Sequence, residues 1–209
     1  MTTIPLDRDA RLDVLHQLLA SATHDASAAM CRWTDGLITL SLDEVQELPL
    51  ETATSALNLG DEMFVMVVLS VQGPLGGELI LMFDEENGRR LAASLLNRPV
   101  CCEGHWSELE KSALTETGNI LGCAYINALT RLIDHELLPT APYFLQDYGA
   151  SVLEQALLVQ AATTDRVLIS RTAFRREGEQ LHWHMLFVPS EAMRIALERA
   201  LHAAPSNTN

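Results

Sequence analysis

The feature that most constrains the fold is an order of predicted elements that occurs twice along the chain. The spacing of apolar residues, interrupted by turn residues, predicts helix, strand, helix, strand, strand and helix over about residues 6–98, and the same order over about residues 106–203. Tandem copies of this kind usually associate about a pseudo-twofold axis. We therefore predict one composite domain over residues 1–209 rather than two independent domains.

The bounds of the elements follow from periodicity, caps and turn residues. In the first copy we predict a helix at 6–33, a strand at 37–48, a short helix at about 51–57, strands at 63–71 and 78–83, and a helix from 85 that ends before Pro99. In the second copy we predict a helix at 106–133, an extended segment near 139–146, a helix around 150–161, strands at about 166–175 and 180–188, and a helix at 191–202. Asp84 and Ser190 are the predicted N-caps of the helices that follow them.

The composition indicates a globular protein with a sizeable core. The chain has 209 residues, 48% of them hydrophobic, and a formal net charge of −14. That charge opposes binding to nucleic acid or to an anionic membrane. The longest purely apolar run, residues 63–69, is far below the roughly 18 residues of a membrane helix, and the first residues lack the apolar segment of a signal peptide. We expect a cytoplasmic protein without nucleic-acid or membrane partners.

Cysteine and histidine spacings give little support for a metal site. The four cysteines, Cys31, Cys101, Cys102 and Cys123, form no C-x-x-C pair, so neither a zinc site nor a redox motif is predicted. Cys101 and Cys102 are interpreted as loop residues, with oxidant sensing as the alternative. Cys123 is interpreted as a small filler, with a modification that blocks docking as the alternative. His182 and His184 share one strand face, which we interpret as solvated rather than metal-binding.

Residues 112–127, SALTETGNILGCAYIN, are the most informative part of the second long helix. On a helical wheel, the side predicted to be buried carries Ala113, Leu114, Thr117, Leu121, Ala124, Ala128 and Leu132. The opposite side carries Ser112, Thr115, Glu116, Asn119, Gly122, Cys123 and Asn127. Glu116 and Asn119 are three residues apart, so they project from adjacent turns toward the same volume. Taken alone, such a pair is common on solvated helix faces.

Two glycines, Gly118 and Gly122, interrupt the same helix. Each costs roughly 1 kcal/mol relative to alanine in a helix interior, so some other interaction is expected to compensate. A closely docking partner and tight packing on a neighbouring helix both remain open as explanations.

The motif Ser112-x-x-x-Glu116-x-x-Asn119-x-x-Gly122 resembles the signature of the CheC family of chemotaxis phosphatases. The resemblance continues through LSLDEVQELPLETATSAL and VVLSVQGPLGGELILMFDEENGRRLAASLL, and so covers nearly the whole chain. It implies an α+β fold in which both halves share a continuous, largely antiparallel sheet. The two long helices are then expected to pack side by side on one face.

The resemblance also implies an activity, the hydrolysis of the phosphoaspartate of a CheY-like receiver domain. Asn119 is then expected to orient the attacking water, and Glu116 to pair with an ammonium group of the docked receiver. Ser112 and Gly122 match positions expected to contact that receiver. No cofactor is expected on this chain, because the receiver supplies Mg²⁺.

The sequence departs from the family pattern in its first half. Family members commonly carry E-x-x-N in both long helices, but here Gln17 and Ala20 align with Glu116 and Asn119. We predict that this first site is inactive, with a register shift of one turn left open. The alternative to a phosphatase is a non-catalytic adaptor that binds a receiver, the deamidase CheD or the flagellar switch.

Overall fold

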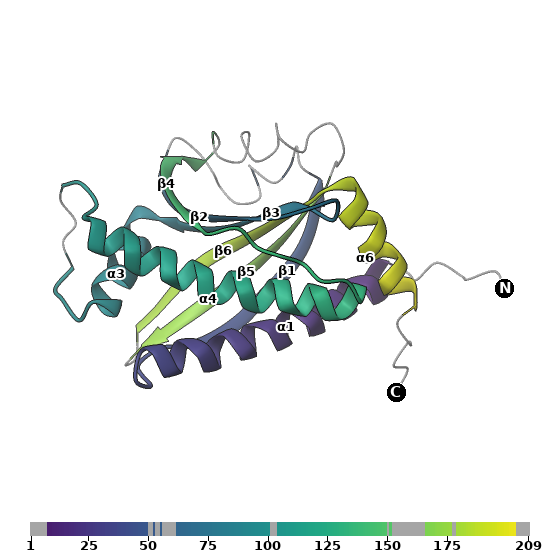
Figure 1. Ribbon diagram of the computed structural model, residues 1–209. Coiled ribbons are helices and arrows are strands. Elements are labelled where there is room, and N and C mark those ends of the chain that lie inside the picture. Colours follow the sequence, from purple (N-terminus) through teal and green to yellow (C-terminus); the bar gives the residue numbers. More distant parts are fainter. Residues whose placement is uncertain are drawn as a thin grey trace.

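The computed structural model describes residues 8–49, 52, 55, 62–100, 104–149, 151, 166–176 and 179–203. The predicted helices at 51–57 and 150–161 lie almost entirely outside these residues, as do Cys101, Cys102 and both chain ends. The elements, in chain order, are α1 (Arg8–Trp33), β1 (Thr39–Pro49), β2 (Met63–Val71), β3 (Gly77–Asp84), α3 (Glu85–Leu95), α4 (Glu108–Ile133), β4 (Tyr143–Tyr148), β5 (Arg166–Arg176), β6 (Glu179–Pro189) and α6 (Glu191–Ala203) (Figure 1).

The described strands form one antiparallel sheet in the order β1-β5-β6-β3-β2-β4. Its centre joins the two copies, because β3 pairs with β6. The first strand of each copy pairs with the hairpin of the other copy, since β1 lies against β5 and β4 lies against β2. The sheet is therefore continuous across both halves, which confirms the predicted α+β arrangement.

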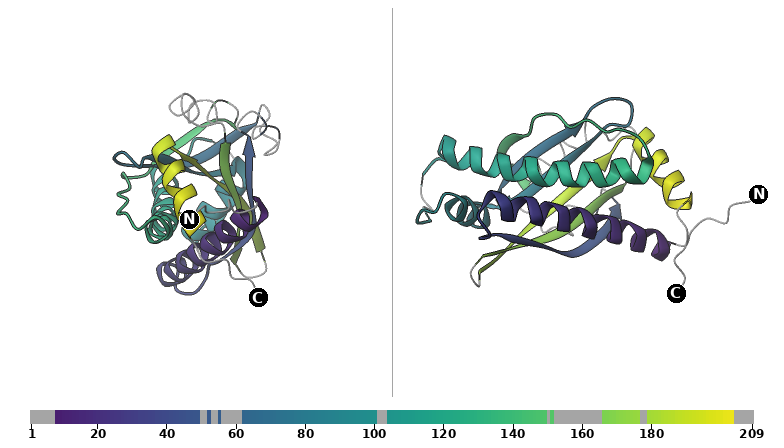
Figure 2. Two further views of the ribbon diagram at one scale, coloured as in Figure 1. Left: turned by 90° about the vertical axis from the view of Figure 1, so that its right-hand side faces the viewer. Right: turned by 60° about the horizontal axis from the view of Figure 1, so that its bottom comes forward.

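The two long helices α1 and α4 lie side by side on one face of this sheet (Figure 2). Alternate β2 residues, among them Val65, Val67 and Leu69, join the helices in one core. The residues between them, Met66 and Val68, belong to a second buried cluster on the other face. Burial on both faces explains why β2 reads as the unbroken apolar run MFVMVVLSV.

Helix ends follow local chemistry that is visible in the sequence. Asp84 caps α3 as predicted, because its Oδ1 accepts a hydrogen bond from the Asn87 amide at 2.7 Å. Ser190 Oγ similarly accepts from the Met193 amide at 3.2 Å. Helix α4 begins at Glu108, two residues later than predicted, because Ser107 and Glu110 form a capping box there.

The extended segment after α4 is shorter than the predicted 139–146. Strand β4 begins only at Tyr143, although Pro139 makes an isolated bridge to Val71. Pro142, directly before Tyr143, lacks the amide that a regular ladder needs, which explains the late start of the strand.

Candidate functional site

Helix α4 presents the predicted pair on its outer side. Glu116 and Ser112 are exposed, and Asn119, one turn further along, is half-buried. Among the residues that the structure describes, Glu116 forms neither a hydrogen bond nor an ion pair. The Asn119 amide oxygen accepts a hydrogen bond from the Cys123 thiol, with Sγ and Oδ1 3.7 Å apart. The pair thus combines a free carboxylate with an amide that is held by a neighbour.

Cys123 remains a protonated thiol in this setting. Partial burial raises its pKa, and the nearby Glu116 carboxylate raises it further. A protonated thiol can donate to Asn119, whereas a thiolate could not. Cys123 therefore helps to orient the Asn119 side chain, a contact that the sequence did not indicate.

The predicted placement of Gly122 on the outer side of α4 is wrong. Gly122 is buried, and a Cβ atom built on it would lie 2.6 Å from Leu69 Cδ2 of β2. Gly118 is buried too, and its Cβ would overlap the Val67 side chain. Both glycines allow α4 to approach the sheet closely, so the compensating interaction is packing on β2 rather than on a helix or a docked partner.

Tyr125 also lies on the inner side of α4 and was missed by the sequence analysis. Its hydroxyl is 2.6 Å from Thr23 Oγ1 of α1 and 3.4 Å from Thr172 Oγ1 of β5. Burial raises the pKa of this phenol, and hydrogen bonds to Thr172 and Thr23 oppose that shift. Tyr125 thus ties α4 to both α1 and the sheet.

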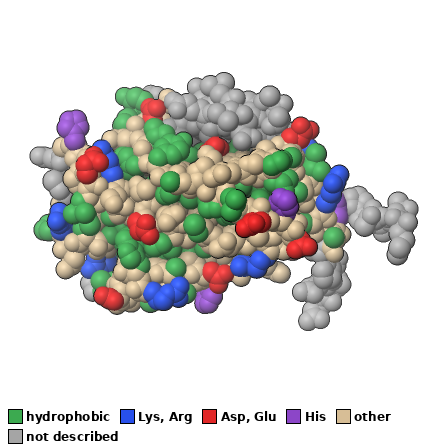
Figure 3. Space-filling model, in the orientation of Figure 1, with side chains coloured by type: hydrophobic (Ala, Val, Ile, Leu, Met, Phe, Trp, Pro, Cys, Tyr) green, Lys and Arg blue, Asp and Glu red, His purple; other side chains and the backbone are tan. Residues whose placement is uncertain are grey.

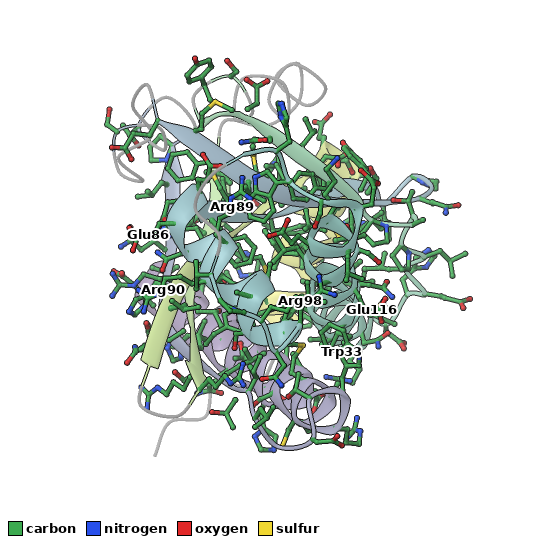
Figure 4. The ribbon with its side chains drawn as sticks, turned by 90° about the vertical axis from the view of Figure 1, so that its left-hand side faces the viewer. Trp33, Glu86, Arg89, Arg90, Arg98 and Glu116 are labelled. Carbon is green, nitrogen blue, oxygen red and sulfur yellow. The ribbon has the colours of Figure 1, made fainter. Side chains whose placement is uncertain are left out.

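The beginning of α4 is fixed by the buried guanidinium of Arg89 in α3 (Figure 4). Its NH2 donates to the Gly104 carbonyl at 2.6 Å and pairs with Glu85 at 3.2 Å, while its Cζ lies 4.2 Å from the Trp106 ring centroid. NH1 lies 3.9 Å from Glu110, one turn into α4. These contacts join α3, the connecting segment and α4, and so position the stripe that carries Glu116.

The pKa of the Glu110 carboxyl also depends on its contacts with Arg89 and Ser107. Partial burial would raise the pKa of its carboxyl, but the hydrogen bonds from Ser107 and the charges of Arg89 and Arg98 outweigh burial and lower it. Glu110 is therefore ionised in the first turn of α4, where its negative charge interacts favourably with the helix dipole.

The two long helices carry the same exposure pattern when residues 99 positions apart are compared. Gln17 and Glu116 are both exposed, and Ala20 and Asn119 are both half-buried. The left-handed residues that follow the helices, Asp35 and Asp134, are also 99 positions apart and both have φ 51°. The structure thus supports the register in which Gln17 and Ala20 match the E-x-x-N pair.

The hydrogen bond between Thr23 and Tyr125 also sets which residues of the antiparallel helices lie level with each other. Nine residues back from Tyr125 is Glu116, and nine residues on from Thr23 is Arg32. Glu116 is therefore level with the end of α1, the neighbouring helix on which Figure 4 labels Trp33. Figure 3 shows the face of α1 and α4 as broad and without a deep hollow among the described side chains, a shape suited to a protein partner.

The histidines of β6 are distant from this surface, on the opposite face of the sheet. His182 Nδ1 lies 3.2 Å from Asp43 Oδ2, and Arg171 Nε lies 3.8 Å from the same oxygen. Burial lowers the pKa of His184, and the charges of Arg171 and His182 lower it further. Over the described ranges no three His, Cys, Asp or Glu residues gather in a metal-binding group.

A separate apolar pocket of about 50 Å³ lies at the other end of α1. It is lined by Arg11, Leu15, Glu47, Val167, Leu168, Phe187, Pro189, Arg194, Leu197, Glu198 and Leu201. Neither Glu116 nor Asn119 borders it. Within the described part of the chain, no helix is long and apolar enough to cross a membrane.

Comparisons with known proteins point to one family. No family model matches the chain. The CheY-P phosphatase CheC of Bacillus subtilis is 22% identical over 205 residues, covering 93% of this chain and 97% of that protein. The putative CheY-P phosphatase CheC1 of Halobacterium salinarum is 23% identical over 142 residues, 68% of this chain and 72% of that protein.

Solved structures share the fold at lower identity. FliY of Thermotoga maritima has a TM-score of 0.69 at 15% identity and covers 93% of this chain and 97% of its own. The FliM middle domain of Helicobacter pylori has a TM-score of 0.66 at 13% identity and covers 93% and 99%. Together with the two curated relatives, this shared architecture supports the resemblance to the CheC family of chemotaxis proteins that is seen in the sequence.

Proposed function

We propose that this protein hydrolyses the phosphoaspartate of a CheY-like receiver domain. The observation that carries the proposal is the E-x-x-N pair on the outer side of α4, where Glu116 is exposed and unpaired and Asn119 stands one turn away. It is supported by the relatives named as CheY-P phosphatases, one of which matches over 93% of this chain.

Asn119 is the residue proposed to act on the attacking water. Its amide oxygen already accepts from Cys123 and has a second lone pair with which to accept from a water. The water oxygen bonds to phosphorus as the bond from phosphorus to the aspartyl oxygen breaks, which releases phosphate, the aspartate carboxylate and a proton to solvent. An acyl phosphate is activated, so orientation of the water is the main contribution required from this chain.

Glu116 is proposed to fix the position of the receiver. An exposed, unpaired carboxylate can pair with an ammonium group of the partner, and the geometry of that pair places Asn119 against the phosphoryl group. Ser112 is exposed one turn earlier and can add a hydrogen bond. Gly122 has no such role, because it faces Leu69 of the sheet.

Mg²⁺ belongs to the receiver in this proposal, as the ion that neutralises charge on the phosphoryl oxygens. The residues of this chain then need only bind the receiver and hold the water.

The second candidate function is a non-catalytic adaptor for a receiver, CheD or the flagellar switch. The fold shared with FliY and FliM favours it, and a FliM of Helicobacter pylori has been solved in complex with FliG. An exposed E-x-x-N pair favours the phosphatase, because flagellar-switch proteins that resemble this chain are not expected to carry that pair.

The deciding experiment measures phosphate release from each phosphorylated receiver of the host, with and without this protein. We expect accelerated release from at least one CheY-like receiver. Receivers that bind the protein but lose phosphate at their intrinsic rate would establish the adaptor instead. CheD is tested in the same assay as a second component.

A further inference from the structure

Arg32, near the end of α1, lies beside the candidate site. It is level with Glu116 across the pair of long helices, as the hydrogen bond between Thr23 and Tyr125 requires. Its neighbour Trp33 is 42% exposed, and Figure 4 labels Trp33 and Glu116 in a view from the side of the molecule where α1 ends and α4 begins. The surface around the E-x-x-N pair therefore includes the end of α1.

The counterpart of Arg32 in the other long helix is Arg131, 99 positions later. Arg131 reaches across the two helices to Asp25, with NH2 and Oδ2 3.3 Å apart. The α4 residue that matches Asp25 is Ala124, which has no carboxylate. Arg131 therefore has an acidic partner at the end that carries Gln17. Its counterpart Arg32 lacks the matching acid at the end that carries Glu116.

Arg32 is consequently an exposed cation without a partner among the residues that the structure describes. It forms no ion pair with Glu116, although the two are level along the helices. Both charges remain available to another protein. An unpaired arginine loses no existing contact when it binds a carboxylate or phosphate, and its planar fork suits both groups.

Apolar side chains border the same charges. Trp33 follows Arg32, and Leu109, which is 46% exposed, precedes Ser112 by one turn on the outer side of α4. Tryptophan and arginine are enriched among residues that dominate binding energy at protein interfaces. Their placement beside Glu116 and Asn119 indicates an interface that extends from α4 onto α1.

We propose that Arg32 and Trp33 form the second half of the receiver-docking surface, with the Arg32 guanidinium on the anionic centre that carries the phosphoryl group. This inference rests on the proposed function. A phosphoryl group is negatively charged, and this chain has a net charge of −14, so the net charge of the chain opposes the approach of that group. Arg32 supplies a positive charge for the phosphoryl group, as Glu116 supplies a negative charge for the ammonium group of the receiver.

The test measures the affinity of a CheY-like receiver loaded with Mg²⁺ and beryllofluoride, a mimic of the phosphoryl group. Trp33 provides the signal, because the other two tryptophans, Trp106 and Trp183, are only 5% and 1% exposed. For Arg32→Glu we expect at least a tenfold loss of affinity. The matched control Arg131→Glu changes the counterpart arginine, and its affinity should stay within about twofold of the native protein.

A second variant supplies the missing acid instead of removing the base. Ala124→Asp gives Arg32 the carboxylate that Asp25 gives Arg131, and should weaken receiver binding several-fold while Asp25→Ala leaves it unchanged. Thermal unfolding verifies that each variant is folded.

The two proposals fail in different ways. If Arg32→Glu binds the loaded receiver as tightly as Arg131→Glu does, the docking role of Arg32 is overturned while the phosphatase proposal stands. If the native protein neither binds nor dephosphorylates any receiver of the host, the proposed function fails and this inference fails with it.

Discussion

The outer sides of α1 and α4 differ where the two helices otherwise correspond. Both helices have 26 residues, and both are followed by an aspartate in the left-handed conformation. The outer positions that carry Glu116 and Asn119 in α4 carry Gln17 and Ala20 in α1. Equivalent exposure with different chemistry shows that burial does not dictate these four residues, which is consistent with the function proposed for the pair in α4.

The inner sides of the two helices differ as well, and there the residue types follow from packing against the sheet. Leu19 and Thr23 of α1 occupy the positions that are Gly118 and Gly122 in α4. The glycines bring the α4 backbone against β2, whereas Leu19 of α1 fills its position in the core with a side chain. The helix with the candidate catalytic pair thus approaches Val67 and Leu69 of the sheet at two glycines.

The largest expected effect comes from giving α4 the inner residue of α1. Gly118→Leu places a side chain where even a Cβ atom overlaps Val67, and should lower the free energy of unfolding by about 3 kcal/mol. Urea denaturation measures the change. The control Asn127→Leu, at an exposed position of α4, should stay within about 0.5 kcal/mol of the native protein. Equal stability of both variants would show that α4 does not depend on close contact with β2.

The next effect is catalytic. Asn119→Ala should reduce stimulated dephosphorylation by about 10²-fold, because the water loses its orienting amide, while receiver affinity changes little. Stopped-flow phosphate release and a binding titration separate the two quantities. Asn127→Ala, two turns further along the same side, serves as the control. Full activity of Asn119→Ala would remove the assigned role.

A smaller effect is expected for docking. Glu116→Lys places a positive charge against the expected receiver ammonium group and should weaken receiver binding about tenfold. Gln17→Lys makes the same change at the matching position of α1 and should leave affinity unchanged. Titration of both variants with one receiver preparation tests the difference, and equal losses would place a second docking site around Gln17.

The smallest effect on stability is expected when the first site is restored. Gln17→Glu with Ala20→Asn should change the free energy of unfolding by no more than about 1 kcal/mol, because both positions lie on the outer side of α1. In an Asn119→Ala background, regained phosphate release would show that the helices differ only in this pair. A large loss of activity from Gln17→Ala alone would contradict an inactive first site.

Much of the fold could be predicted because its determinants are local. The side chains of Asp84 and Ser190 accept hydrogen bonds from amides of the helices that follow them, and so mark where those helices begin. Asp35 and Gly36, both with positive φ, mark the end of α1. The exchange of first strands between the copies depends on long-range pairing, which periodicity does not encode. The shared sheet was expected only through the resemblance to a known family.

The site was predictable where exposure follows helical spacing and not where packing distances matter. Ser112 and Glu116 lie outward as the wheel requires. The same wheel placed Gly122 outward, because a wheel gives only the angular position of a residue around the helix. It contains no information on the distance between α4 and the sheet. Arg32 could not be found from sequence, since its significance depends on a neighbouring helix and on the residue that replaces Asp25 there.

Because each copy pairs its first strand with the hairpin of the other copy, neither copy has a complete sheet by itself. A chain with a single repeat would have a hairpin without its outer strand, and could complete its sheet only by taking that strand from a second molecule. Two identical halves would then carry identical helices. Joining the halves in one polypeptide makes assembly independent of concentration and lets α1 and α4 change separately, so one helix can lose its E-x-x-N pair while the other keeps it.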